Sequence, residues 1–335
     1  MSVFIIAEAG VNHNGNIKLA KRLVDMAVEC GADAIKFQTF KAEESTGKYA
    51  DKAKYQKENT DVYESQLEMI KKLELPFEDF KILKNYCDEK GIKFISTPDG
   101  KESLKFLLEI GLDIIKIGST EVSNIDFLEQ IGRTGKEIIL STGMSTLGEV
   151  EKAIMALKST GNNKIKIMQC TTDYPTAYED ANVRAMVTMR EAFKVPVGLS
   201  DHTIGNEAAI AAIALGAKFV EKHITLDKNM EGPDHKASMD YSDFKGYVQS
   251  LRNTEKLLGD GIKKPTKREL EIMKNVRRSI VAAKNIEKGT VIEKSILAYK
   301  RPGTGIKPEF ADMIIGKTLK RDISEDEIIN WDDIL

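Results

Sequence analysis

Short β-branched runs alternate with longer amphipathic stretches over the first three-quarters of the chain. In the stretch 17–30, Leu23 and Met26 fall on one helical face, and Gly31 then supplies a residue type that often ends helices. The strands that we predict lie at 3–8, 34–40, 93–97, 114–118, 137–141, 165–170, 195–200 and 219–225. The helices that we predict lie at 17–30, 77–90, 102–110, 125–131, 147–159, 182–193, 207–215 and 240–258. The repeated strand-then-helix order, without a Gly-x-Gly-x-x-Gly turn, favours an α/β fold of the closed (β/α)8 TIM-barrel type. An open doubly wound sheet remains the alternative.

Polar side chains stand at the carboxyl end of every predicted strand. They are Glu8, Lys36, Gln38, Ser96, Thr97, Lys116, Ser119, Ser141, Thr142, Thr171, Thr172, Ser200, Asp201, His202, Glu221 and His223. This end of a TIM barrel is where active sites are built, and alternation sends residues i and i+2 to the same side of a strand. Helix capping explains the serines and threonines, but it does not explain the lysines, glutamates and histidines. We therefore expect an active site here.

All four histidines lie in short polar segments. His202 and His223 end adjacent strands beside carboxylates, which predicts an open divalent-metal site with positions left for water and substrate. For His13, a role in chemistry and a role in capping a turn both remain open.

Lysine charge and hydroxyl donors could hold a small phosphate and a carboxylate. The candidates are Lys36, Lys116, Thr97, Ser119, Ser141 and Ser200.

Two segments depart from the regular pattern. The connection 41–76 is far longer than an ordinary loop and contains a helix-like stretch at 63–70. A lid over the barrel and a surface decoration are both open interpretations. Beyond the barrel domain (1–260) we predict a linker at 261–278 and a small β-rich module at 279–335. That module is too short for a large core of its own.

Composition excludes several classes of protein. The chain has 335 residues, 41% of them hydrophobic and 30% charged, and a net charge of −2, without the basic excess of a nucleic-acid binder. Three widely spaced cysteines indicate neither a disulfide framework nor a zinc knuckle. No apolar run approaches membrane-spanning length, and the first residues lack the basic region of a signal peptide. We expect a cytoplasmic protein.

Taken together, the motifs resemble the bacterial sialic acid synthase family, which includes legionaminic acid synthases. The resemblance rests on Ala-Glu-Ala-Gly-Val-Asn-His-Asn-Gly at 7–15, Lys-Phe-Gln-Thr at 36–39, Ser-Thr-Pro at 96–98, Lys-Ile-Gly-Ser at 116–119, Ser-Thr-Gly-Met at 141–144, Leu-Ser-Asp-His-Thr at 199–203, Glu-Lys-His at 221–223 and Gly-Pro-Asp at 232–234. The segment Lys-Arg-Pro-Gly at 300–303, with Ile314 and Gly316, is similar to that family's antifreeze-like (SAF) domain.

The resemblance implies condensation of phosphoenolpyruvate with N-acetylmannosamine, or a close analogue, to give a sialic acid-type nonulosonic acid and phosphate. One alternative is N,N'-diacetyllegionaminic acid synthesis from 2,4-diacetamido-2,4,6-trideoxymannose. An alternative of another class is a non-catalytic barrel that binds a sugar phosphate. An aldehyde panel assayed for phosphate release would separate the three.

The resemblance also implies roles for individual residues. His202 and His223 would bind Mn²⁺, or another divalent cation such as Mg²⁺ or Co²⁺. Phosphoenolpyruvate would be held by Lys36, Thr97, Lys116, Ser119, Ser141 and Ser200. The sugar would be held by Glu8, Gln38, Tyr174 and Asp234. Thr172 is a further substrate-binding candidate, in the segment where the family's asparagine would contact phosphoenolpyruvate. Glu121 would sit by the reacting centre, and Glu121, Glu221 and Lys36 are the catalytic candidates. Arg301 would reach the sugar's acyl group in a domain-swapped homodimer.

Three segments differ from the family's usual pattern. Thr171 and Thr172 stand where an asparagine is common, Thr120 precedes Glu121, and Asp99 replaces a phenylalanine after the Thr-Pro pair. The last change removes an aromatic wall. None of the three affects the paired histidines.

Overall fold

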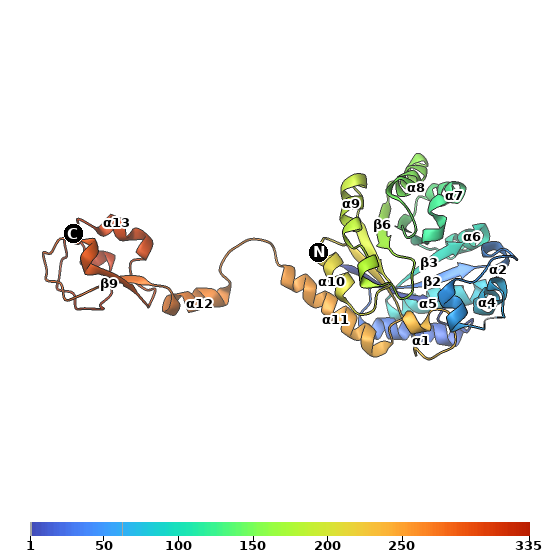
Figure 1. Cartoon of the computed structure of the whole chain (residues 1–335), viewed down its shortest axis with the longest axis horizontal. Coiled ribbons are helices and arrows are strands. Elements are labelled where there is room, and N and C mark those ends of the chain that lie inside the picture. The colour runs from blue at the N-terminus through green and yellow to red at the C-terminus, as the bar shows by residue number, and fades with distance from the viewer. Residues whose placement is uncertain (1, 62) are drawn as a thin grey trace. The chain divides into compact units, whose positions relative to one another are not determined.

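Eight parallel strands close into a barrel in the first of two units of the chain (Figure 1). The computed structural model describes residues 2–61 and 63–335, and the two units are Met1–Gly259 and Asp260–Leu335. The strands are β1 (Phe4–Gly10), β2 (Ala34–Phe40), β3 (Lys93–Asp99), β4 (Ile114–Ile117), β5 (Glu137–Ser141), β6 (Ile165–Cys170), β7 (Val197–Asp201) and β8 (Phe219–His223). Pairing of β1 with β8 closes the barrel and sets Glu8 opposite His223. The predicted TIM barrel is confirmed, and the open sheet is excluded.

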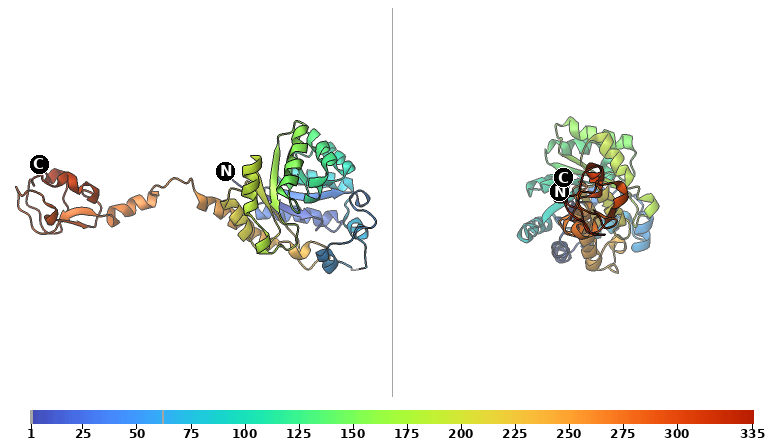
Figure 2. Two further views of the ribbon diagram at one scale, coloured as in Figure 1. Left: turned by 45° about the horizontal axis from the view of Figure 1, so that its top comes forward. Right: turned by 90° about the vertical axis from the view of Figure 1, so that its left-hand side faces the viewer.

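Helices surround the barrel on its outer side (Figure 2). They are α1 (Ile17–Cys30), α5 (Phe77–Lys90), α6 (Lys101–Glu109), α7 (Ile125–Arg133), α8 (Leu147–Ser159), α9 (Arg184–Phe193), α10 (Glu207–Ala214) and α11 (Tyr241–Leu258). The apolar face predicted for the first of them is buried, including Leu23 and Met26, and Gly31 ends that helix in a left-handed conformation. Burial of these faces against the strands forms the main hydrophobic core.

The barrel interior is layered because inward side chains recur every two residues along each strand. The lowest layer is apolar and consists of Ile6, Ala34, Ile95, Ile114, Ile139, Met168 and Phe219. Two residues further along these strands stand Glu8, Lys36, Thr97, Lys116, Ser141, Cys170 and Glu221. The apolar layer fills the barrel interior at its level. A polar cavity can therefore open only beyond it, toward the carboxyl ends of the strands.

Some predicted strand ends were wrong. β3 continues through Pro98 to Asp99, pairing with Thr39 and Phe40 of β2. β8 stops at His223, whereas the prediction extended it to residue 225. The Ile224 N–H still donates to the Glu8 carbonyl oxygen at 2.8 Å, but Ile224 then bridges Met239, so the strand ends before it.

The long segment 41–76 contains three short helices, α2 (Ala42–Ser45), α3 (Lys54–Asn59) and α4 (Gln66–Leu73). The helix predicted at 63–70 therefore starts three residues later, where Ser65 caps it by accepting from the Glu68 N–H. Leu73 is buried with Val11 and Phe40 in a small apolar cluster. This part of the segment is thus packed on the ends of β1 and β2.

The second unit contains α12 (Lys267–Val276), the antiparallel strands β9 (Ser279–Ala282) and β10 (Leu297–Lys300), and α13 (Ala311–Ile314). Its own core is rich in isoleucine, including Ile280, Ile306 and Ile329. The Gly303 N–H donates to the Lys274 carbonyl oxygen at 2.8 Å, so α12 is bound to the β-rich module. Among the described residues, no helix is long and apolar enough to cross a membrane.

A close approach inside the barrel predicts a stability effect. A Cβ atom on Gly198 of β7 would lie 2.3 Å from the Phe219 carbonyl oxygen and 2.4 Å from its ring. We expect Gly198→Ala to lower the free energy of unfolding by about 1–3 kcal/mol, because the neighbouring strand must shift. Urea denaturation followed by circular dichroism measures this.

Gly148 provides the matched control. It lies in α8, and no neighbouring atom comes within 4 Å of the place that its Cβ would take, so Gly148→Ala should stabilise the chain by up to about 1 kcal/mol. Equal unfolding midpoints for the two alanine variants would contradict the packing argument.

Candidate active site

A cavity of about 230 Å³ opens at the carboxyl ends of the barrel strands. It is lined by most of the residues that the sequence singled out. These are Glu8, Lys36, Gln38, Thr97, Lys116, Ser119, Ser141, Thr172, Tyr174, Ser200, His202, Glu221 and His223. Because they come from all eight strands or the turns after them, only the closed barrel brings them together.

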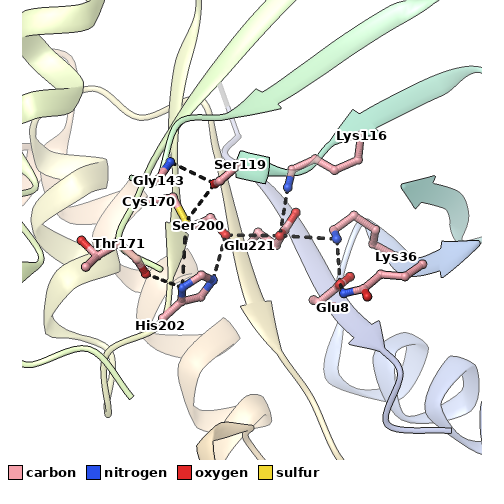
Figure 3. A network of polar contacts seen from close by, with 11 residues as sticks. Glu8, Lys36, Lys116, Ser119, Gly143, Cys170, Thr171, Ser200, His202 and Glu221 are labelled. Atoms are coloured by element: carbon pink, nitrogen blue, oxygen red, sulfur yellow. Dashed lines mark hydrogen bonds and ion pairs between the residues drawn. The ribbon is translucent and has the colours of Figure 1, made fainter. Parts of the chain in front are cut away.

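Two lysines and two glutamates form a buried charge network at the floor of this cavity (Figure 3). Lys36 Nζ lies 2.7 Å from Glu8 Oε1 and 3.6 Å from Glu221 Oε1. Lys116 Nζ lies 3.3 Å from the same oxygen of Glu221. The second carboxylate oxygen of each glutamate, Oε2, is buried without a hydrogen bond to any described residue. The four charges balance, yet the network retains unused acceptors.

Burial and neighbouring charge move the pKa values of this network in different directions. Burial alone would raise the pKa of Glu221, but Lys116 and Lys36 lower it to about 2. Burial opposes charge on Lys36, yet Glu221 and Glu8 outweigh it and raise its pKa. Burial lowers the pKa of Lys116 more than Glu221 raises it, whereas burial raises the pKa of Glu8. Of the two lysines, Lys116 is thus the one whose charged form an added anion stabilises more.

Hydroxyl groups flank the lysines. Ser141 Oγ is buried and makes no hydrogen bond within the described chain, so its donor is available to a ligand. Ser119 Oγ accepts the Gly143 N–H at 2.9 Å. A Cβ on Gly143 would lie 2.3 Å from Thr172 Oγ1 and 2.9 Å from Ser119 Oγ. Glycine at this turn therefore lets both hydroxyls approach the cavity.

The rings of the two strand-end histidines meet edge-on in the cavity wall, with centroids 5.4 Å apart. The carbonyl oxygen of Thr171 lies 2.7 Å from His202 Nδ1 and can only accept, so Nδ1 carries a proton, and Nε2 lies 3.3 Å from Ser200 Oγ (Figure 3). Burial opposes a charge on His202, yet Cys170, Thr171 and Glu221 outweigh it and raise its pKa. Burial holds the pKa of His223 well below its usual value, which keeps that ring neutral. Its Nδ1 is buried with no hydrogen-bond partner among the described residues.

A neutral imidazole with fixed orientation is a suitable ligand for a divalent cation, and a protonated one becomes a ligand when the cation displaces its proton. The orphaned ring nitrogen of His223 and the His202 ring held by the Thr171 carbonyl oxygen fit such an ion. Within residues 2–61 and 63–335, no three His, Cys, Asp or Glu side chains are grouped to hold a metal. The paired histidines would therefore leave most coordination positions to water or substrate.

A second cavity of about 150 Å³ adjoins the first. Gln38, Asp99, Tyr174 and His223 line both. The second also has a polar side with Gln56 and Asp234 and an apolar wall of Val11, Phe40, Met69, Ile70 and Leu73. Burial and then Glu8 raise the pKa of Asp234 to about 6. Asp234 therefore joins the site through this cavity.

Glu121 lies outside the cavity walls, and Arg301 belongs to the other unit of the chain. Glu121, expected beside the reacting centre, lines neither cavity, since its carboxylate accepts from Asn124 Nδ2 at 2.7 Å in the turn after β4. Arg301 follows β10 in the second unit, where its side chain is exposed.

His13 and His235 lie outside both cavity walls. The Gly15 N–H donates to His13 Nδ1 at 3.1 Å, which supports the turn-capping interpretation of His13. His235 contacts Thr225 Oγ1 at 2.7 Å and Asn14 Oδ1 at 3.1 Å. It thereby connects the loop that carries Asp234 to the loop after β1.

Sequence reasoning missed Asp99 and the apolar wall. Asp99 was interpreted only as the loss of an aromatic residue, although it stands two positions after Thr97 and so points the same way along β3. Met69 and Leu73 showed a helical pattern, but nothing local indicated which part of the barrel they would contact.

Comparison with known proteins agrees with this geometry. Residues 23–263 match the NeuB family, and residues 277–335 match the SAF domain. The N,N'-diacetyllegionaminic acid synthase of Campylobacter jejuni is 46% identical over 327 residues, which cover 97% of this chain and 98% of that protein. The synthase of the same name from Legionella pneumophila is 44% identical over 338 residues, covering 100% of this chain and 95% of that protein.

A solved structure is also similar. The crystal structure of the N-acetylneuraminic acid (sialic acid) synthetase of Leptospira borgpetersenii, in complex with citrate, has a TM-score of 0.73 and 34% identity. The match covers 82% of this chain and 90% of that one. The family match over most of the chain, the barrel and the SAF module agree, and the chain belongs to the NeuB family.

Proposed function

We propose that this enzyme condenses phosphoenolpyruvate with the open-chain aldehyde of an N-acetylated amino sugar, giving a nonulosonic acid and phosphate. The observation that carries the proposal is the pair of buried lysines, Lys36 and Lys116, beside the unpaired Ser141 hydroxyl on a cavity floor. Buried lysines at this place are explained by an anionic ligand. A barrel that only binds sugar phosphates is not supported by relatives that are named synthases.

Phosphoenolpyruvate fits the first cavity because its phosphate and carboxylate need cations and hydroxyl donors. Lys36, Lys116 and Ser141 supply these, and Thr97, Ser119 and Ser200 lie around them. Ser200 Oγ donates to Glu221 Oε1 at 3.2 Å, so Glu221 holds both Lys116 and this hydroxyl in place. We assign Glu221 this orienting role beside the lysines.

The second cavity fits the amino sugar. Asp234 and Gln56 offer polar contacts for hydroxyl and amide groups, and Glu8 with Gln38 does so at the junction of the cavities. The apolar side chains Val11, Phe40, Met69 and Leu73 support this cavity but are almost fully buried, so the surface left to a ligand is mainly polar. A 2,4-diacetamido-2,4,6-trideoxy sugar carries a second amide group, whereas N-acetylmannosamine carries hydroxyls in its place. We favour the diacetamido sugar because two relatives named N,N'-diacetyllegionaminic acid synthase are 46% and 44% identical over nearly the whole chain.

The reaction forms one carbon–carbon bond and releases phosphate. The methylene carbon of phosphoenolpyruvate attacks the aldehyde carbon, and the aldehyde oxygen takes up a proton to become a hydroxyl. Water then adds to the cationic C2, which loses phosphate to become the ketone. Lys36 and Lys116 stabilise the phosphate and carboxylate charge throughout, and the closed floor keeps other water away.

The proposal includes a divalent cation, Mn²⁺ first, held by His202 and His223. Such a cation supplies Lewis-acid polarisation of the aldehyde oxygen. Tyr174 stacks on the His202 ring with centroids 4.1 Å apart and meets His223 edge-on, so it helps to orient both imidazoles.

A domain-swapped homodimer and a cytoplasmic location complete the proposal. Arg301 is exposed on its module, which leaves its guanidinium free to reach an acyl group bound in the barrel of a second chain. The three cysteines are free and buried, as expected in a reducing compartment.

The function predicts phosphate release only when phosphoenolpyruvate and a suitable aldehyde are both present. We expect 2,4-diacetamido-2,4,6-trideoxymannose to give a higher kcat/KM than N-acetylmannosamine. A pocket separates substrates that differ by a small group by about 1–3 kcal/mol, which predicts a preference of roughly 10- to 200-fold. A phosphate-release assay over a panel of aldehydes measures it, and phosphate release without any aldehyde would contradict the proposed reaction.

Metal removal tests the paired histidines. We expect a chelator to abolish phosphate release and added Mn²⁺ to restore it, and we expect His202→Ala to lose Mn²⁺ binding while its circular dichroism spectrum is unchanged. Asn124→Ala, at the turn outside both cavities, is the control and should bind Mn²⁺ normally. Full activity in excess chelator would rule out the metal assignment.

Lys116→Met tests the phosphoenolpyruvate end. Loss of one charge-assisted contact costs about 1.5–3 kcal/mol, so the KM for phosphoenolpyruvate should rise by roughly 10- to 150-fold while that for the sugar changes little. Lys105→Met, with a lysine that is 80% exposed on α6, should leave both constants unchanged. An unaltered KM for phosphoenolpyruvate would show that Lys116 contacts neither anion.

A further inference from the structure

Asp99 occupies a position that the proposed chemistry has not used. It is the last residue of β3, and its side chain lines both cavities. Along β3, Ile95 belongs to the apolar inner layer and Thr97 to the level of the lysines, so Asp99 is the next inward position above them. Register with β2 sets it opposite Phe40 of the apolar wall. Asp99 therefore stands where the two substrates must meet.

The Asp99 carboxylate is half-buried but has no hydrogen bond or ion pair with a described residue. Its charged neighbour is Glu121, and burial together with that carboxylate raises the pKa of Asp99 to about 6. A half-buried carboxylate beside another carboxylate is costly unless a ligand supplies donors.

The chemistry of the two substrates decides which of them supplies hydrogen-bond donors to Asp99. Phosphoenolpyruvate carries only anionic groups at neutral pH, so it would be repelled by the Asp99 carboxylate. The amino sugar is uncharged and rich in O–H and N–H donors. Because Asp99 lies at the junction with the first cavity, the donor that reaches it is near the aldehyde carbon, which must approach phosphoenolpyruvate.

We propose that Asp99 is a specificity-determining residue that accepts a hydrogen bond from an amide N–H or hydroxyl beside the aldehyde carbon of the amino sugar. This inference rests on the proposed function and refines it. This bond would fix the reacting end of the sugar, while the rest of the second cavity, with Gln56 and Asp234, would hold its far end. A pocket built to pair with a substrate donor discriminates strongly against analogues that lack it.

Two variants and two measurements test the proposal. For Asp99→Ala we expect the KM for the amino sugar to rise by roughly 10-fold or more, the effect of one lost hydrogen bond to a charged group. The KM for phosphoenolpyruvate should stay the same or fall, because a negative charge is removed. Asp99→Asn keeps one acceptor oxygen and should lie between the wild type and alanine. Glu44→Gln, an exposed carboxyl on α2 that lines neither cavity, should match the wild type.

Calorimetry with the reduced, open-chain sugar alcohol measures the same contact without turnover. We expect Asp99→Ala to weaken this binding and Glu44→Gln to preserve it. Unchanged sugar binding in both Asp99 variants, or a selective loss of phosphoenolpyruvate affinity, would overturn the proposal. A different result would overturn the proposed function alone: the wild type binds the sugar alcohol more tightly than Asp99→Ala does, yet it releases no phosphate with any aldehyde. The hydrogen bond to Asp99 would then still be supported.

Discussion

The buried network of Lys36, Lys116, Glu8 and Glu221 is the constraint on which the rest of the site depends. Four charges inside a barrel are stable only because each lies within ion-pair distance of an opposite charge. These residues stand on β1, β2, β4 and β8, so the network also fixes how those strands meet. The free Oε2 atoms and the unpaired Ser141 hydroxyl show that the protein leaves part of its polar capacity unsatisfied without a ligand.

The two ends of the site have opposite characters, and this separates the substrates. Cations and hydroxyls are concentrated on the floor, whereas Asp99, Asp234 and apolar side chains line the upper cavity. In the proposed function the anionic substrate takes the floor and the uncharged sugar the upper cavity. That proposal puts bond formation beside the residues shared by the two cavities, which include Tyr174 and His223.

Period-two alternation made most of the floor predictable from the sequence. Once a strand is placed, Lys36 and Gln38, or Glu221 and His223, must point to one side, and parallel strands align those sides. The apolar wall could not be predicted in this way, because Met69 and Leu73 reach it through a long connection whose path depends on tertiary packing. The position of Glu121 was not predictable for a related reason. Its turn after β4 is held by a local bond to Asn124, which strand periodicity does not describe.

The apolar wall has a separate origin from the charged floor. Every lysine and glutamate of the floor belongs to a barrel strand, while Met69, Ile70 and Leu73 belong to α4, in an insertion between β2 and α5. Substitutions in this insertion alter the shape offered to the sugar without breaking a barrel ladder or an ion pair. The part of the chain that shapes the upper cavity can thus be altered separately from the strands that carry the proposed carbon–carbon bond-forming chemistry.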